Sequence, residues 1–368
     1  LTSSTVRPDT VITRPDQYVG ATLYTGNAGT KSIDVGHKPD FVWVKARTGS
    51  TRSHFLFDSV RGVQKFLQTD GTAGESNADA TSLTSFNNDG FTTGARAGMN
   101  ENSVNYVAWT WKAGGNKNTF NIDDVGYASA AAAGLTAGDT TIAGASVGTK
   151  QGFSIIKYTG PNDTSAHEVA HGLSQAPDFI ITKNLDNTYN WDIYHSALGD
   201  NEYLIFTTAA KDSGRFSGRP TSTVFKTAHD YSTNENEDYI AYCWHDVPGL
   251  QKFGSYESNS SGVFVELGFR PALLVVKNAD AALTNSQWNV VDTQRDTYNP
   301  SLNNLAWNRN NTEPAVSAST YGIDIVSNGF HIPSGNTGEA INNTTATQTY
   351  IYAAWAEAPA FNLYGAQS

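Results

Sequence analysis

His167, Glu168 and His171 form the pattern with the clearest chemical potential in this chain, the spacing H-E-x-x-H. On a helix, two histidines one turn apart can bind one zinc ion, and the glutamate can act as the base. The flanking residues Pro161 and Gly172 leave no room for a long helix. On a strand the two histidines would lie about 13 Å apart, at about 3.3 Å per residue, too far to bind one ion. The sequence therefore predicts a strand here and no metal site.

Carboxylate pairs are the second candidate chemistry. A glycosidase needs two carboxylates roughly 5–10 Å apart across a cleft. The densest acids are Asp123 with Asp124, Glu235 with Glu237 and Asp238, and Asp292 with Asp296. The Glu235–Asp238 group lacks the spacing of a calcium loop, and no P-loop or G-x-G-x-x-G motif is present. We therefore predict structural acids, no catalytic residue and no cofactor, with a polysaccharide depolymerase kept as an alternative.

Two of these acids stand at matching places in similar segments. Asp58 is followed three residues later by Arg61, and Asp292 by Arg295. An aspartate and an arginine at this offset can hold a turn through charge-assisted hydrogen bonds. A third similar segment has His195 and Leu198 at these places, so the pair is not universal.

Trp307 suggests a binding site, because it lies among asparagine and arginine residues at 303–309. An aromatic face can pack on the C–H side of a sugar while amides and a guanidinium bind its hydroxyls. We predict a glycan contact formed by Trp307, Arg309, Tyr298 and Asn299. The alternative is that Trp307 packs on a neighbouring module or subunit.

The elements that must position these residues repeat three times along the chain. Each copy has an apolar stretch ending in lysine, at residues 39–45, 177–183 and 271–277. Each copy closes on a tyrosine and, after four residues, a tryptophan: Tyr106 and Trp111, Tyr239 and Trp244, Tyr350 and Trp355. Residues shared by all copies are framework rather than active site, so we expect these tryptophans in the core.

The repeat predicts an all-β chain of three tandem antiparallel β-sandwich modules, lectin- or jelly-roll-like. About seven short strands alternate with Gly, Asn, Asp and Ser clusters in each copy. Residues 41–44 and 273–276 are apolar at consecutive positions, so both faces of those strands should be buried. The predicted units are an extended arm at 1–17, modules at 18–115, 152–249 and 250–360, an insertion at 116–151 with a short helix near 127–135, and a tail at 361–368.

Composition excludes several classes of protein. A net charge of −11 argues against binding to nucleic acid, whose phosphates would be repelled. No apolar run approaches the roughly 18 residues that a membrane span needs, so we expect no membrane insertion. The single cysteine, Cys243, excludes an intrachain disulfide, and we expect a buried thiol. Few charges and abundant Gly, Ser, Thr and Asn are typical of a β-rich extracellular or particle-borne protein.

With these residues laid out, the chain resembles the repeat-containing virion structural proteins of tailed bacteriophages, of marine and cyanophage type. The matching stretches are residues 152–160, 171–183, 239–245, 268–271, 295–300 and 350–357. The likeness covers about 18 to 360, and the first module departs most because it lacks His-Gly-Leu before Pro39. The resemblance implies a tail fibre, tail spike or particle-surface protein, located on the virion with other virion proteins as partners. It also implies a homotrimer, and it brings no catalytic residues.

The expected function is display of the modules for adhesion to host-surface polysaccharide. Recognition should involve regions where the copies differ, at 116–150, 212–236 and 296–320. One alternative is a purely architectural capsid-decoration or tail component without ligand, and the other is the depolymerase.

Overall fold

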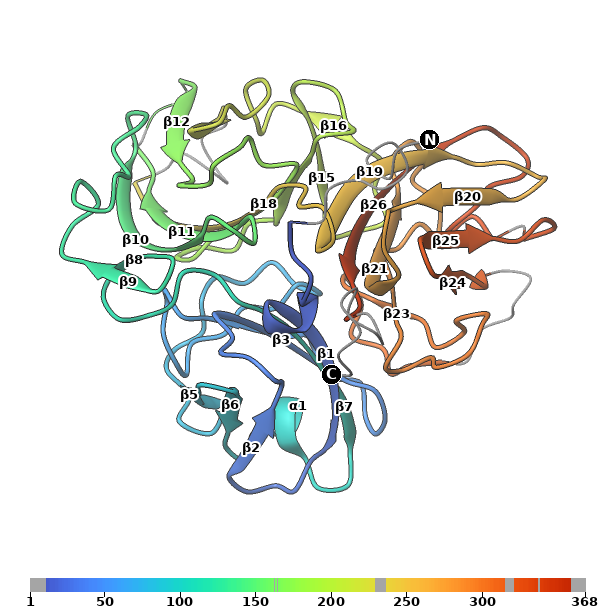
Figure 1. Ribbon diagram of the computed structural model, residues 1–368, viewed down its shortest axis with the longest axis horizontal. Coiled ribbons are helices and arrows are strands. Elements are labelled where there is room, and N and C mark those ends of the chain that lie inside the picture. The colour runs from blue at the N-terminus through green and yellow to red at the C-terminus, as the bar shows by residue number, and fades with distance from the viewer. Residues whose placement is uncertain are drawn as a thin grey trace.

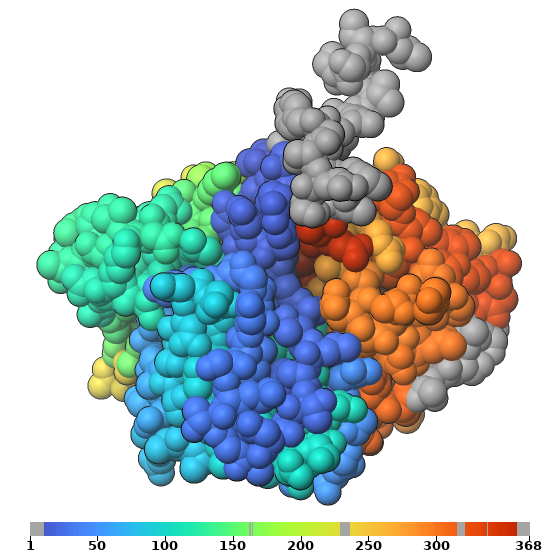
Figure 2. Space-filling view, turned by 60° about the horizontal axis from the view of Figure 1, so that its bottom comes forward, coloured from blue at the N-terminus to red at the C-terminus, as the bar shows by residue number. Residues whose placement is uncertain are grey.

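The computed structural model describes residues 11–161, 163, 165–228, 236–314, 321–336 and 338–358. Nearly all of its regular elements are strands, so the all-β prediction is confirmed. Three lobes surround a common centre (Figure 1). In the space-filling view the blue first module lies between the green second module and the orange third (Figure 2).

The first module consists of two sheets. Its inner sheet has the order β1 (Val19–Thr25), β7 (Asn105–Trp111), β3 (Phe41–Ala46), β4 (Phe55–Asp58). Its outer sheet has the order β2 (Lys31–Asp34), β6 (Gly90–Thr93), β5 (Leu83–Phe86). The short helix α1 (Ala97–Asn100) lies between β6 and β7 in the chain.

The other two modules repeat this strand order. The second has β11 (Phe153–Thr159), β18 (Asp238–Trp244), β13 (Phe179–Asn184) and β14 (Asp192–His195), extended by β15 (Glu202–Ile205) and β16 (Asp212–Ser213). Its outer pair is β12 (His167–Ala170) and β17 (Val224–Thr227). The third has β19 (Gln251–Glu257), β26 (Thr349–Ala356), β21 (Pro271–Asn278), β22 (Asn289–Asp292) and β23 (Leu305–Ala306), with an outer sheet of β20 (Val263–Glu266), β25 (Gly329–Ile332) and β24 (Asp324–Val326).

The central strands of each inner sheet are buried on both faces, as predicted for residues 41–44 and 273–276. In β3, Phe41 and Trp43 belong to a core shared by the three modules, whereas Val42 and Val44 pack under the outer sheet of their own module. Successive side chains of a strand point to opposite faces, so a continuous apolar run requires a cover on each side. The outer sheet covers one face, and the neighbouring modules cover the other.

Three tryptophans meet at the centre of the molecule. The ring centroids of Trp111, Trp244 and Trp355 lie 5.4 to 6.1 Å apart, and the rings are inclined by 66 to 71°. This edge-to-face arrangement is favoured by the quadrupoles of the rings. All three residues are buried, which confirms their prediction as core. The modules are therefore related by an approximate threefold axis through this cluster.

Equivalent backbone hydrogen bonds join the modules in a closed ring. Glu75 N donates to Leu185 O at 2.6 Å, between the first and second modules. Lys211 N donates to Ala279 O at 2.7 Å, between the second and third modules. Glu313 N donates to Arg47 O at 3.0 Å, between the third and first. Each accepting carbonyl comes two residues after the repeated lysine, so one contact of the repeat recurs at all three seams.

The residue before the fourth strand of each inner sheet forms a second ring of contacts. Trp191 Nε1 donates to Gln68 O at 3.0 Å, and Trp288 Nε1 donates to Ile205 O at 2.8 Å. The first module has His54 at this place, and its Nε2 lies 2.9 Å from Ala306 O. Two tryptophans and one histidine thus make the same contact with the next module.

The prediction of a helix near 127–135 is wrong. The insertion contributes β8 (Phe120–Ile122), β9 (Val125–Tyr127) and β10 (Thr141–Gly148), which extend the inner sheet of the second module. Asp123 and Asp124 have φ of 49° and 65° and form a tight hairpin turn, where short polar side chains tolerate positive φ. The alanine-rich stretch makes only turns, and Gly134 at φ 73° changes its direction.

The end of the predicted arm is packed against the body of the molecule. Val11 N and Ile12 N donate to Pro248 O at 3.0 and 3.3 Å, and Ile12 is buried in the shared core. A 3₁₀ turn, η2 (Pro15–Gln17), then leads into β1. The predicted arm residues 1–10 and the tail 361–368 lie outside the described residues.

Candidate ligand pockets

Trp307 lies in the shared core and not on a surface. Its side chain is 1% exposed and stacks on Trp43 of the first module, with ring centroids 4.2 Å apart. Phe206 of the second module packs edge-on against it at 6.2 Å. No face of the ring is open to a sugar, so the predicted contact through Trp307 does not form. The alternative expectation, packing on a neighbouring module, describes what the structure shows.

The other three predicted residues lie on the surface of the third module but do not form one site with Trp307. Tyr298 is 86% exposed. The amide of Asn299 is occupied, because it accepts from Ile325 N and donates to Ile325 O, both at 2.9 Å. Arg309 is exposed and lines a pocket.

This pocket, which we name the amide pocket, has a volume of about 110 Å³ and lies at the start of β22. Its polar lining comprises Gln287, Asn289, Asn304, Arg309, Asn311, Thr312 and Tyr321. Asn304 Nδ2 donates to Asn289 Oδ1 at 3.0 Å. Asn304 Oδ1 is buried and accepts no hydrogen bond from the residues that the structure describes. The pocket therefore holds a preorganised acceptor that a donor could satisfy.

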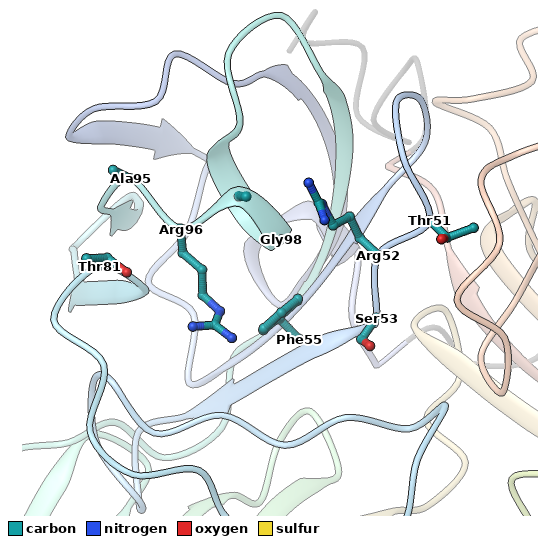
Figure 3. Close-up of a pocket in the computed structure, with 9 residues that line it drawn as sticks. Thr51, Arg52, Ser53, Phe55, Thr81, Ala95, Arg96 and Gly98 are labelled. Carbon is teal, nitrogen blue, oxygen red and sulfur yellow. The ribbon is translucent and has the colours of Figure 1, made fainter.

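A larger pocket, the arginine pocket, lies at the start of β4 in the first module (Figure 3). Its volume is about 520 Å³, and its lining comprises Thr51, Arg52, Ser53, Phe55, Thr81, Ala95, Arg96, Ala97 and Gly98. Figure 3 shows Arg52 and Arg96 on opposite sides of Phe55. A Cβ at Gly98 would lie 2.1 Å from Phe55 Cε2, so only glycine permits this approach of α1 to the ring.

The two pockets open at corresponding places in their modules. Phe55 begins β4 and Asn289 begins β22, and both face the same position of the neighbouring strand, Val44 and Val276. Ser53 and Gln287 precede them by two residues and line the respective pockets. The location repeats while the chemistry of the lining differs. Sequence reasoning missed both pockets, although Ser53 and Gln287 occupy matching places in the aligned copies.

His167 and Glu168 lie on strand β12, as predicted, and His171 directly follows its last residue. His167 Nδ1 lies 3.0 Å from Asp139 Oδ2, and its Nε2 lies 2.7 Å from Asp163 Oδ1. These nitrogens lie on opposite sides of the ring, so the two carboxylates do not converge on one ion. His171 is buried, with Nε2 3.1 Å from Thr221 O. Within the described ranges, no group of three metal-ligating side chains is placed to hold an ion.

His167 has the electrostatics of a paired surface histidine. Burial lowers its pKa, but hydrogen bonds to Asp163 and Asp139 outweigh this and raise the pKa above its usual value. Neither contact activates a nucleophile or a water.

The two Asp–Arg pairs hold turns, as predicted. Arg61 Nε donates to Asp58 Oδ2, and Arg295 Nε donates to Asp292 Oδ2, both at 2.5 Å with all four side chains buried. Each aspartate also binds a neighbouring module. Asp58 accepts from the Tyr242 hydroxyl at 2.7 Å, and Asp292 accepts from Trp109 Nε1 at 3.0 Å. In the second module His195 Nε2 lies 3.0 Å from Tyr352 O, so all three modules use this place at a seam.

The remaining candidate acids make structural contacts. Asp123 accepts from Thr149 N at 2.8 Å, Asp238 pairs with Lys157 at 2.7 Å, and Asp296 accepts from Asn303 N at 2.8 Å. Glu235 lies outside the described residues. Burial raises the pKa of the Cys243 thiol, which suits the predicted buried cysteine.

The repeated lysines are buried at the seams. Lys45 Nζ donates to Asn310 O of the third module at 3.2 Å, and Lys277 Nζ donates to Ala209 O of the second at 2.9 Å. Burial lowers the pKa of Lys277 to about 7 and the pKa values of Lys45 and Lys183 to about 8. The framework lysines thus titrate near neutral pH without contacting either pocket.

Folding stability is therefore expected to rise with pH above neutrality. Between about pH 7 and 10.5 the unfolded chain binds more protons at Lys277 than the folded chain, so the free energy of unfolding increases with pH. From pH 7 to 9 we expect a gain of about 2 kcal/mol from this lysine. Guanidinium chloride denaturation at both pH values measures this gain. In Lys277→Met the free energy of unfolding should rise less with pH than in wild type, whereas in Lys117→Met, at an exposed lysine, it should rise as in wild type. An unchanged slope in Lys277→Met would refute this assignment.

Comparison with known proteins identifies the family of this chain. No curated protein matches the chain. Of the part that the structure describes, no helix is both long and apolar enough to traverse a membrane. A family described as a domain of unknown function, DUF7483, matches residues 14–359, a range that includes the strands of all three modules. The chain belongs to the DUF7483 family.

Proposed function

We propose that the protein is a structural component of a tailed-bacteriophage particle that adheres to host-surface polysaccharide without cleaving it. The proposal combines the resemblance of its framework motifs with the observation that carries the binding function, the amide pocket. Other virion proteins would be its partners, and the virion surface its location.

A saccharide suits the amide pocket because sugar hydroxyls both donate and accept hydrogen bonds. Asparagine and glutamine offer both roles in one rigid group, and Asn304 Oδ1 accepts no hydrogen bond from the described residues. Arg309 adds donors at the rim. The ring of Tyr321 and the apolar Leu305 and Pro314 supply surfaces for the C–H faces of a sugar.

A homotrimer, implied by the resemblance, remains part of this proposal. The inner sheets are already covered by the modules of one chain, through the cluster of Trp111, Trp244 and Trp355. Contacts between chains would therefore use the outer surfaces of the lobes.

Removing the amide pocket's polar groups should weaken glycan binding. We expect Asn304→Ala and Arg309→Ala each to lower the affinity for a neutral host polysaccharide about tenfold, because each removes a hydrogen-bonding group from the pocket. Isothermal titration calorimetry would measure this loss. Asn88→Ala, an exposed asparagine of the first module, is the matched control and should bind like wild type. Equal affinity of all three variants would contradict the proposed site.

Incubation with the polysaccharide also separates the alternative functions. Retention of the polymer with unchanged chain length, measured by size-exclusion chromatography, supports adhesion. Progressive shortening would instead establish a depolymerase. Failure to retain any envelope polysaccharide would favour a purely architectural component.

A further inference from the structure

We infer that the arginine pocket binds the oxyanion of an acidic saccharide, a sugar that carries a carboxylate or a sulfate ester. This inference rests on the proposed function for the sugar part of the ligand. The oxyanion part rests on the donors of Arg52 and Arg96.

Arg96 is held in place before any ligand arrives. Its guanidinium lies over the rings of Phe66 and Phe55, at 4.4 and 5.0 Å from the centroids. It also pairs with Asp79, which in turn accepts from Thr81 N and Thr81 Oγ1 at 2.9 and 2.6 Å. Cation–π contacts and an ion pair fix both the position and the plane of the guanidinium. A ligand would therefore not have to order this side chain.

Arg52 is anchored from two directions. Its Nη2 donates to Glu101 Oε2 at 2.7 Å, and its backbone N donates to Asn310 O of the third module at 3.1 Å. The loop that carries Arg52 is thus held at the seam between the first and third modules. Figure 3 shows Thr51, the preceding residue, on the side of the pocket towards the third module.

Both guanidinium groups retain donors that suit an anion. Each guanidinium uses one terminal nitrogen in an ion pair, Arg52 Nη2 with Glu101 and Arg96 Nη1 with Asp79, which leaves its other terminal nitrogen for a ligand. Asp79 is already engaged by Thr81 and Arg96, so its oxygens are committed. Arginine forks match the planar geometry of carboxylates and the oxygens of sulfate esters. The hydroxyls of Thr51, Ser53 and Thr81 can bind the remaining sugar oxygens.

Segments that line the arginine pocket and the amide pocket meet at one seam. Asn310, whose carbonyl accepts from Arg52 N, lies between Arg309 and Asn311, which line the amide pocket. An acidic polysaccharide carries both hydroxyl groups and acidic groups along one chain. The neighbouring pockets therefore favour a saccharide, rather than a free anion, as the carrier of the oxyanion.

The test compares oligomers of glucuronic acid with neutral glucose oligomers of the same length by calorimetry on the full chain. Wild type should bind the acidic oligomer at least tenfold more tightly, and added salt should weaken this preference. Arg52→Gln and Arg96→Gln should each abolish the preference, whereas the exposed Arg14→Gln should preserve it. Inorganic sulfate should compete only weakly. Equal binding of the two oligomers, or an acidic preference that survives both substitutions, would overturn the inference.

Two features keep this test independent of folding and of the amide pocket. Arg96 stacks on two rings, so Arg96→Gln can disturb the fold. Arg52 has no ring contact among the described residues. If Arg96→Gln does not fold, the binding preference of Arg52→Gln therefore tests the inference by itself. Asn304→Ala should weaken the neutral oligomer while leaving the acidic preference intact. If wild type does not bind the neutral oligomer, only the function proposed for the amide pocket is contradicted. If wild type does not prefer the acidic oligomer, only the function inferred for the arginine pocket is contradicted.

Discussion

Replacing Trp355 by alanine is expected to lower the free energy of unfolding by about 3–5 kcal/mol. The ring is buried at the centre of the molecule. Its centroid lies 5.4 Å from that of Trp111 in the first module and 6.1 Å from that of Trp244 in the second. The substitution opens a cavity among three modules at once, and neighbouring strands cannot close it without distorting their sheets. Guanidinium chloride denaturation followed by far-UV circular dichroism measures the loss.

Two controls show whether this effect comes from the shared core. Tyr298→Ala removes an aromatic ring that is 86% exposed, so its effect should stay within about 0.5 kcal/mol. Trp355→Phe keeps an aromatic face at the centre and should cost less than Trp355→Ala. Three separable unfolding steps in the wild-type chain, or a neutral Trp355→Ala, would contradict a core common to all modules.

The second large effect is expected for Asp58→Asn, which should destabilise the fold by about 3–5 kcal/mol. Asp58 and Arg61 are both buried, and the amide removes the negative charge while Arg61 keeps its positive charge. The Tyr242 hydroxyl also loses a charged acceptor across the seam between modules. Arg61 Nη1 keeps only a longer contact with Glu75 Oε1, at 3.4 Å. A buried charge that loses its closest partner costs more than the ion pair contributes, so the loss should exceed that of an exposed pair.

The second module itself suggests the compensating substitution. It has His195 and Leu198 at the places of Asp58 and Arg61, and burial lowers the pKa of His195 to about 4, so this pair is neutral. Asp58→His combined with Arg61→Leu should therefore be more stable than Asp58→Asn. Thermal and chemical denaturation of the three proteins would show this order. A double variant no more stable than the single one would contradict the role assigned to the buried charge.

Much of the local structure could be predicted from the sequence, because it depends on neighbouring residues. The lysine-ended stretches became β3, β13 and β21, and the tyrosine and tryptophan ends became β7, β18 and β26. The strand predicted for the H-E-x-x-H segment is β12, although it ends at Ala170, one residue before His171. The helix near 127–135 was not correctly predicted, because a run of alanines favours a helix locally but here makes only turns beside the strands of the insertion.

The candidate site was less predictable, since a pocket depends on residues that are distant in sequence. Arg309 was predicted to contact a glycan; it lines the amide pocket with Gln287 and Asn304, which were not identified from the sequence. We predicted that Trp307 contacts a glycan, but it stacks on Trp43 of another module. No periodicity in 303–309 indicates that contact.

The sequence by itself determined the strand pattern, the threefold repeat and the alternation of side chains on each inner sheet. The alternation follows from local geometry, because successive side chains of a strand point to opposite faces. It also indicated that both faces of β3 and β21 need a cover. Only the tertiary structure decided what covers the second face: the other two modules, meeting at Trp111, Trp244 and Trp355. The same non-local packing buried Trp307 and held the loop of Arg52 against Asn310, which brings segments of the two pockets together.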